Sequence, residues 1–207
     1  DLDGIDISSI YFDEILELKL QKSLKNLNVN SLEAILIHDS DILKNKNSFR
    51  LIEWLRKIKS RKIVKKIGVS IYEKSDLFFS LNYFDIIQLP LSIYDQRLKE
   101  NGTIEILKNN SIEIHLRSIF LQGLILQGYS KWPDFLNPLF IEHHKKISLI
   151  ARENKLSLLE LTICFLEKYI DAEIALMGIT SEKELKEIID ASQKIKSRNS
   201  YDLDFRS

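Results

Sequence analysis

Polar side chains end several isoleucine-rich runs in this chain, and they are the first candidates for chemistry. His38, Ser70 and Gln88 each close such a run, and Ser118 closes a fourth. Imidazole, hydroxyl and amide groups donate and accept hydrogen bonds, so they suit the binding of a small polar ligand. The pattern is typical of a β/α enzyme whose ligand lies at the carboxyl ends of its strands.

A second candidate site follows the last isoleucine-containing run. Gly178 and Thr180 precede Ser181-x-x-Glu184, which has the spacing of a capping box at the start of a helix. Free backbone N–H groups and the helix dipole at such a start could receive a phosphate. Capping boxes are also common in helices with purely structural roles, so this segment alone leaves both interpretations open.

The elements that must position these residues alternate between strands and helices. Strands are expected at 34–38, 66–70, 85–88, 113–118 and 174–178. Helices are expected at 11–27, 49–59, 75–81 and 103–109, and again from Pro138, Ser157 and Ser181, with loops at 91–101 and 122–137. Strands separated by helical crossovers should be parallel and buried on both faces. A closed eight-stranded barrel usually needs about 250 residues, so we expect either an open sheet or a chain that lacks its beginning.

Composition narrows the class of protein. The 207 residues include 30 Lys and Arg and 30 Asp and Glu, which removes any global electrostatic reason to expect nucleic acid or an anionic membrane as a partner. No apolar stretch reaches the roughly 18 residues of a membrane helix, and the start of the chain lacks the layout of a signal peptide. We expect one cytoplasmic domain spanning 1–207.

Metal and thiol chemistry are not expected. Cys164 lies in an apolar run and should be a buried hydrophobic residue. His143 and His144 are adjacent on a helix and point in different directions, so we interpret them as part of a solvated face rather than as metal ligands.

Several stretches, in this order and at these spacings, resemble the aldo-keto reductase family. They are 32–39, 67–72, 84–90, 117–123 and 176–181. Members of that family are β/α TIM barrels that bind NADPH, less often NADH, across the carboxyl end of the barrel and reduce aldehydes and ketones. The chain resembles their fourth through eighth βα units. This implies a partial barrel of about five parallel βα units, with the amino-terminal units missing.

The resemblance also implies roles for individual residues. His38 corresponds to the active-site histidine that hydrogen-bonds the substrate carbonyl, although a histidine satisfied at a strand end is the alternative. Ser70 and Gln88 correspond to residues that bind the nicotinamide carboxamide. A buried glutamine needs partners in any case, so a core polar group bonded to neighbouring loops is the alternative for Gln88.

The remaining correspondences concern the rest of the cofactor. Ser118, Leu121 and Gly123 match the segment along the pyrophosphate. Gly178, Thr180 and Ser181 match the loop that holds the adenosine phosphate.

Three positions depart from the family pattern. Ile71 replaces a common asparagine, and Arg117 replaces an aromatic residue that stacks on the nicotinamide. Arg117 is therefore either a cofactor contact or part of a polar layer with Glu113 and His115. Glu184 falls where NADPH-preferring members often have an arginine, which weakens the expected preference for NADP over NAD.

The family's proton donor has no counterpart in these residues. It is a tyrosine whose pKa is lowered by a lysine, and both belong to earlier strands. Tyr11, Tyr72, Tyr83 and Tyr94 do not lie in the tyrosine motif. Since a positioned general acid typically contributes about 10²–10⁴ in rate, the chain alone is expected to be inactive.

Two functions follow from this reasoning. The first is an NAD(P)H-dependent oxidoreductase that reduces an aldehyde or ketone, here as a truncated chain without the catalytic Tyr and Lys. The second is a noncatalytic barrel fragment that binds a nucleotide or a protein. In either case, the exposed strand edges of an open sheet favour self-association.

Overall fold

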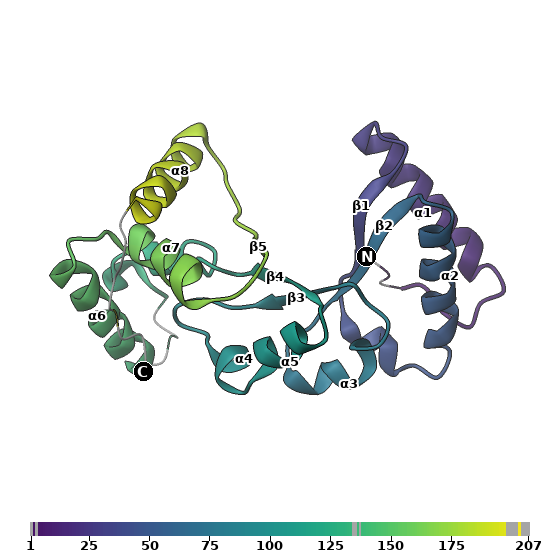
Figure 1. The fold of residues 1–207 in the computed structure, drawn as a ribbon, viewed down its shortest axis with the longest axis horizontal. Coiled ribbons are helices and arrows are strands. Elements are labelled where there is room, and N and C mark those ends of the chain that lie inside the picture. The colour runs from purple at the N-terminus through teal and green to yellow at the C-terminus, as the bar shows by residue number, and fades with distance from the viewer. Residues whose placement is uncertain (1, 3, 134–135, 137, 198–202, 204–207) are drawn as a thin grey trace. The chain divides into compact units, whose positions relative to one another are not determined.

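A single sheet of parallel strands organises the chain. The computed structural model describes residues 2, 4–133, 136, 138–197 and 203. The strands follow chain order in the sheet and are β1 (Leu32–Ile37), β2 (Val64–Ser70), β3 (Ile86–Pro90), β4 (Glu113–Arg117) and β5 (Ile174–Ala175). The pairings β1–β2, β2–β3 and β4–β5 are all parallel. The predicted α/β class is confirmed (Figure 1).

Helices connect the strands. The α-helices are α1 (Phe12–Leu27), α2 (Ser48–Ser60), α3 (Leu77–Ser80), α4 (Arg97–Glu100), α5 (Thr103–Asn109), α6 (Pro138–Glu153), α7 (Leu158–Tyr169) and α8 (Glu182–Lys196). Short 3₁₀ helices lie at Ser40–Lys44, Lys74–Asp76, Leu124–Leu126 and Tyr129–Lys131.

The chain forms two compact units. Unit 1 comprises Asp1–Leu89 and Asn101–Ile114, and unit 2 comprises Pro90–Glu100 and His115–Ser207. Each unit therefore contains two separate stretches of sequence.

In unit 1, α1 is held by an apolar stripe and a defined end. Phe12, Leu16, Leu20 and Leu24 recur at helical spacing and are all buried. Asn28 then adopts a left-handed conformation with φ 54°, and its N–H bonds the carbonyls of Leu24 and Lys25. This turn ends α1, and β1 begins at Leu32.

Helix α2 is amphipathic, as predicted. Its buried residues are Leu51, Ile52, Trp54, Leu55 and Ile58. Lys57 and Lys59 lie in its last turn, where cations interact favourably with the helix dipole. Lys59 also donates to both carboxylate oxygens of Asp85 at 2.7 Å.

Close packing in the sheet of unit 1 requires a glycine at position 68. A Cβ built on Gly68 would lie 2.8 Å from the carbonyl oxygen of Ile86 and 2.9 Å from Cγ of Leu36. Gly68 therefore lets β2 lie against both neighbouring strands and brings their carboxyl ends close together.

In unit 2, α7 begins with a capping box at Ser157, where a helix start is predicted. Ser157 accepts from the N–H of Glu160, and the Glu160 carboxylate accepts from the N–H of Ser157. Cys164 is fully buried, as expected, and burial raises the pKa of its thiol to about 11.

Some expectations about the elements were wrong. The last strand pairs over Ile174–Ala175 alone and is exposed rather than buried on both faces. The segment 91–101 contains α4 rather than only loop. Ser181 caps α8, but the Glu184 carboxylate bonds Thr180, so the reciprocal half of the box does not form there. Asn137, the residue before α6, lies outside the described residues.

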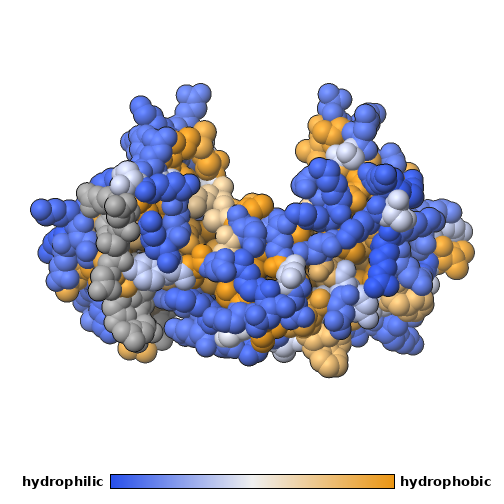
Figure 2. Space-filling model, in the orientation of Figure 1, coloured by the Kyte–Doolittle hydropathy of each residue, from blue (hydrophilic) through white to orange (hydrophobic). Residues whose placement is uncertain are grey.

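The surface mixes polar and apolar side chains. Figure 2 shows mostly hydrophilic residues on the visible face, with apolar patches between them. The most exposed large apolar residues include Phe78 at 86% and Ile10 at 81%. Single exposed apolar side chains are ordinary on protein surfaces, so these residues alone do not indicate a binding site.

Candidate functional site

Ser70, the last residue of β2, and Gln88, the third residue of β3, form a hydrogen-bonded pair on neighbouring strands. Ser70 is paired with Gln88 in the β2–β3 register, and its hydroxyl donates to Oε1 of Gln88 at 3.0 Å. Ser70 is buried and Gln88 is half-buried. Their bond fixes the orientation of the amide, which leaves Nε2 as a donor and Ser70 Oγ as an acceptor for a further partner.

His38 lies at the same level of the sheet. It follows Ile37, which is the register partner of Val69, so His38 comes beside Ser70 in the order of the strands. Its side chain is exposed. The strand ends of unit 1 therefore bring His38, Ser70 and Gln88 to adjacent register positions, as the sequence predicts for a shared site.

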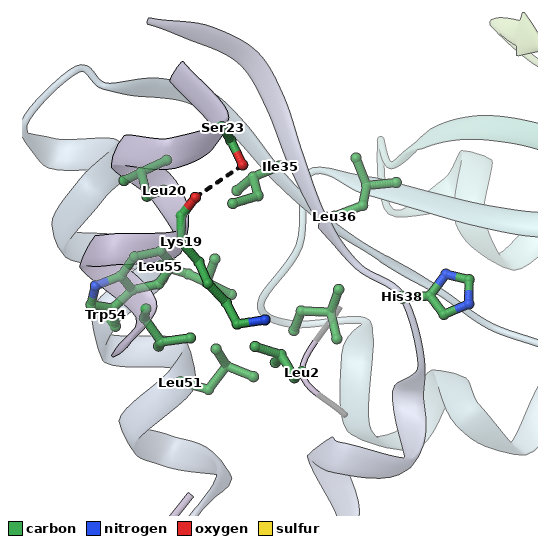
Figure 3. A pocket seen from close by; sticks show the side chains of 12 residues that line it. Leu2, Lys19, Leu20, Ser23, Ile35, Leu36, His38, Leu51, Trp54 and Leu55 are labelled. Atoms are coloured by element: carbon green, nitrogen blue, oxygen red, sulfur yellow. Dashed lines mark hydrogen bonds between the residues drawn. The ribbon is translucent and has the colours of Figure 1, made fainter. Parts of the chain in front are cut away.

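A pocket of about 190 Å³ lies between α1, α2 and β1. Its lining is mainly leucines and isoleucines and also includes His38, whose ring Figure 3 shows directed away from the leucines. The nearby polar contact is structural, since the Ser23 hydroxyl donates to the Lys19 carbonyl at 3.0 Å (Figure 3). We therefore assign this pocket to packing and do not include it in the site.

A buried carboxylate anchors the loop after β2. Oδ2 of Asp76 accepts from the N–H groups of Tyr72 and Glu73 at 3.0 and 3.1 Å. Burial has the largest influence and raises the pKa of Asp76, but these amides, the Ser40 hydroxyl and Lys44 together outweigh it. The resulting pKa of Asp76 is below its usual value, and the network holds the chain that leaves Ser70.

The segment after β4 contains a cluster of left-handed residues. Ser118, Leu121 and Gln122 have φ values of 61°, 46° and 57°, and Gly123 has 84°. Non-glycine residues adopt this conformation at a cost of about 1–3 kcal/mol each, and such residues cluster at ligand-binding segments. The strain lies in the segment that the resemblance places along the pyrophosphate.

A larger pocket in unit 2 joins this segment to the loop before α8. Its volume is about 550 Å³, within the range of small-molecule sites. The predicted residues that line it are Ser118, Gly123, Gly178, Thr180 and Glu184. A Cβ on Gly178 would meet nothing within 4 Å, so the loop backbone is open to a ligand.

Glu184 is tied to the same loop. Its carboxylate accepts from the N–H of Thr180 at 2.7 Å and from the Thr180 hydroxyl at 2.9 Å. Both bonds lower the pKa of Glu184. The backbone hydrogen bond from Thr180 has the largest effect, and the side-chain hydrogen bond from Thr180 has the next largest. The group is therefore a carboxylate anion at neutral pH.

The predicted cofactor residues thus fall into two groups. Ser70 and Gln88 belong to unit 1, whereas the residues from Arg117 to Glu184 belong to unit 2. Arg117, Leu121 and Ser181 adjoin the pocket of unit 2 in sequence but are not among its lining residues. Nη1 of Arg117 donates to Ser118 Oγ at 3.3 Å. Its suggested companion in a polar layer, Glu113, pairs with Lys66 in unit 1.

Sequence reasoning missed a polar pair in unit 2. The prediction that His144 belongs to a solvated face was wrong, because its side chain is 2% exposed. Its Nδ1 lies 2.5 Å from the Tyr94 hydroxyl, and the ring packs against Trp132 at 4.5 Å between centroids. Burial raises the pKa of Tyr94 and lowers the pKa of His144.

Within the described residues, no group of three or more His, Cys, Asp or Glu side chains is placed to hold a metal ion. No helix of the described part of the chain has the length and apolar character that crossing a membrane requires.

With the fold and the site in place, the comparisons identify the class of protein. The sequence model of the Aldo/keto reductase family matches residues 8–202. The chain belongs to this family.

Solved structures agree with this assignment. The holo form of aldo-keto reductase AKR11C1 from Bacillus halodurans is 16% identical to this chain, with a TM-score of 0.71. The match covers 89% of this chain and 64% of the Bacillus halodurans chain. The glycerol dehydrogenase AKR11B4 from Gluconobacter oxydans is 13% identical to this chain, with a TM-score of 0.63. The match covers 92% of this chain and 67% of the Gluconobacter oxydans chain. At such identities the likeness shows the fold alone.

The chain spans 64% of the length of the Bacillus halodurans structure, which is less than two thirds. A search among curated proteins found no match.

Proposed function

We propose that this chain forms part of an NAD(P)H-dependent oxidoreductase that reduces an aldehyde or a ketone in the cytoplasm. The observation that carries this proposal is the hydrogen-bonded Ser70–Gln88 pair on adjacent parallel strands in a chain of the Aldo/keto reductase family. Family membership alone gives the fold and the general chemistry. The pair supports the proposal because it would give the reactive end of the cofactor a specific place to bind.

The chemistry of the pair matches that of a primary carboxamide. A carboxamide presents one oxygen that accepts and one NH₂ group that donates. Because Ser70 donates to Oε1 of Gln88, the Gln88 amide is oriented to donate and Ser70 Oγ can accept. Two such bonds would hold the nicotinamide ring flat and in one orientation at the strand ends.

The other predicted residues complete the proposal. His38, at the register level of Ser70, would hydrogen-bond the carbonyl oxygen of the substrate and orient it. Ser118, Leu121 and Gly123 would follow the pyrophosphate, and Gly178 and Thr180 would receive the adenosine end in the pocket of unit 2. The bound cofactor would supply the hydride.

The reaction also needs a proton for the developing alkoxide. The residues of this chain include no counterpart of the family's tyrosine and lysine. Tyr94 does not fill the role, because burial raises its pKa and its hydroxyl is bonded to His144. We therefore propose that the chain alone binds the dinucleotide without reducing a carbonyl. Self-association through the exposed strand edges stays a prediction.

Fluorescence titration of the purified chain with NADH and NADPH tests the proposal. We expect at least one dinucleotide to bind, and Gln88→Leu to weaken that binding about tenfold, as loss of one or two hydrogen bonds predicts. Gln21→Leu, on the exposed face of α1 in the same unit, should leave it unchanged. Absence of binding by both nucleotides would overturn the proposal and favour a protein-binding fragment. Carbonyl reduction by the chain alone would show that another residue donates the proton.

A further inference from the structure

Asp76 joins the loops that follow β1 and β2 in unit 1. Its carboxylate accepts from the N–H groups of Tyr72 and Glu73, which follow β2, and from the Ser40 hydroxyl, which follows β1. Asp76 is 5% exposed and Ser40 is 2% exposed, so water competes little for these bonds. One buried side chain therefore links the exits of two neighbouring strands.

The positions of these contacts relate them to the candidate site. His38 directly follows the last register pair of β1 and β2, and so it lies beside Ser70. Ser40 comes two residues after His38, and Tyr72 comes two residues after Ser70. Asp76 therefore bonds both stretches of chain at the same number of residues beyond the site.

A third contact from the loop after β1 reaches the same carboxylate. Nζ of Lys44 lies 3.7 Å from Oδ1 of Asp76. The Lys44 side chain is 49% exposed, so water screens this attraction and it adds little. The 3₁₀ helix Ser40–Lys44 also packs against α3, which begins at the residue after Asp76. The buried hydrogen bonds, rather than the ion pair, carry the link.

Carbonyl reduction depends on the spacing of the two strand ends. In the proposed function, His38 holds the substrate carbonyl, while Ser70 and Gln88 hold the nicotinamide. The hydride must pass between these groups, and a displacement of about 1 Å can lower a rate about 100-fold. The β1–β2 register of the described residues ends just before His38, so the Asp76 link restrains the spacing from the far side.

We propose that Asp76 is a positioning residue, which sets the spacing between His38 and Ser70 through its bonds to the loops after β1 and β2. The inference rests on the proposed function, which assigns the carbonyl to His38 and the nicotinamide to Ser70. It goes further by naming a residue outside the ligand-binding groups that controls where the two ligands meet.

The test separates the link to His38 from the stability of unit 1. Ser40→Ala removes the hydroxyl from the Asp76 carboxylate and leaves its two backbone N–H bonds in place. Ser80→Ala is the matched control, because Ser80 is 0% exposed and its hydroxyl donates to the Asp76 carbonyl at 2.7 Å. Both variants lose one buried serine hydroxyl beside the same residue, but only Ser40→Ala cuts the link to the loop after β1.

The readout is the proximity of the His38 ring to the bound nicotinamide. The chain is saturated with NADH or NADPH, whichever binds more tightly in the fluorescence titration, and nuclear Overhauser effects from the histidine ring protons are recorded. Their absence in His38→Gln identifies the His38 signals among those of the four histidines. We expect a cross-peak between His38 and the nicotinamide in the wild type and in Ser80→Ala. It should weaken several-fold or vanish in Ser40→Ala, because the effect falls steeply with distance.

Dinucleotide affinity provides the internal comparison. Ser40→Ala keeps the Ser70–Gln88 bond, so its affinity should stay within about twofold of wild type. Asp76→Ala releases both loops and should lose the cross-peak as well. Circular dichroism of each variant checks that it is folded, and Ser40→Ala carries the test if Asp76→Ala does not fold.

The remaining outcomes separate the two proposals. A full cross-peak in Ser40→Ala, or an equal loss in Ser80→Ala, would overturn the inference and leave the proposed function intact. A wild-type chain that binds the dinucleotide without a cross-peak to His38 would overturn the inference and the role of His38, but not dinucleotide binding. Failure of both dinucleotides to bind would overturn the proposed function, and the inference with it.

Discussion

The Tyr94 hydroxyl and Nδ1 of His144 lie 2.5 Å apart, and they join the loop after β3 to the middle of α6. Both rings pack within an aromatic cluster that also contains Trp132 and Phe140. Nε1 of Trp132 in turn donates to the Leu124 carbonyl at 2.9 Å. The Tyr94–His144 pair, packed against Trp132, therefore helps to hold the segment between β4 and α6 in place within unit 2.

We expect Tyr94→Phe to destabilise the chain. The substitution leaves the buried His144 without its hydroxyl partner, which costs about 1–3 kcal/mol of unfolding free energy. Urea denaturation followed by circular dichroism measures the change. Tyr129→Phe is the control, because Tyr129 is 48% exposed and should tolerate the change within about 0.5 kcal/mol. Equal stability of the two variants would show that the Tyr94–His144 bond contributes nothing.

Stability should decline between pH 7.5 and pH 5.5. Burial lowers the pKa of His144, with a smaller effect from His143, and burial and Lys146 lower that of His143. Below about pH 6.5 the unfolded chain takes up protons that the folded chain does not, so the free energy of unfolding falls as the pH falls. Denaturation across this range, repeated with His144→Gln, should show a flatter decline in the variant. An increase in stability toward pH 5.5 would contradict the assignment.

Asp76→Ala should destabilise unit 1. The N–H groups of Tyr72 and Glu73 would lose their shared acceptor, at a cost of about 1–3 kcal/mol. Because the folded pKa of Asp76 is lowered, the stabilisation is present above the unfolded value of about 3.9 and is lost as the pH falls through the folded pKa. Denaturation at pH 7 and pH 3 measures both effects, with the exposed Glu53→Ala as control. The gap between Asp76→Ala and wild type should narrow at the lower pH.

Gly68→Ala should be more harmful than its single added carbon suggests. The new Cβ would lie 2.8 Å from the Ile86 carbonyl oxygen, so β2 must shift away from β3. Overpacking of this kind costs about 1–3 kcal/mol. Gly128→Ala, which meets only Ser130 Oγ at 3.9 Å, should be tolerated. Thermal melts compare the two variants, and a similar loss in both would show that the sheet adapts easily.

The strands that sequence predicted best are the buried ones. β2 is buried from Ile67 onward, and β3 is buried except at the half-buried Gln88. Most of these residues are apolar, so Ser70 and Gln88 stood out as the polar residues of the two runs. The last strand was overestimated, because its apolar residues Ile174 and Leu176 are exposed. The strand comprises Ile174–Ala175, and one further bond joins the Leu176 N–H to the Leu116 carbonyl.

Long-range polar partners could not be predicted in the same way. Tyr94 and His144 are separated by 50 positions, and no local periodicity links a loop hydroxyl to one imidazole of a helical pair. The bonds from Thr180 to Glu184 show the reverse case. The spacing correctly predicted the start of α8. The Glu184 carboxylate can reach the N–H of either Thr180 or Ser181, however, and the sequence alone does not show which of them it bonds.

The interleaving of the two units has a practical consequence for dissecting the protein. The polypeptide passes from one unit to the other after Leu89, after Glu100 and again after Ile114, so neither can be produced by a single truncation. A protease cut between 90 and 100 would sever a connection that both parts share. Engineering one half in isolation would require circular permutation or a linker that replaces the excised stretch.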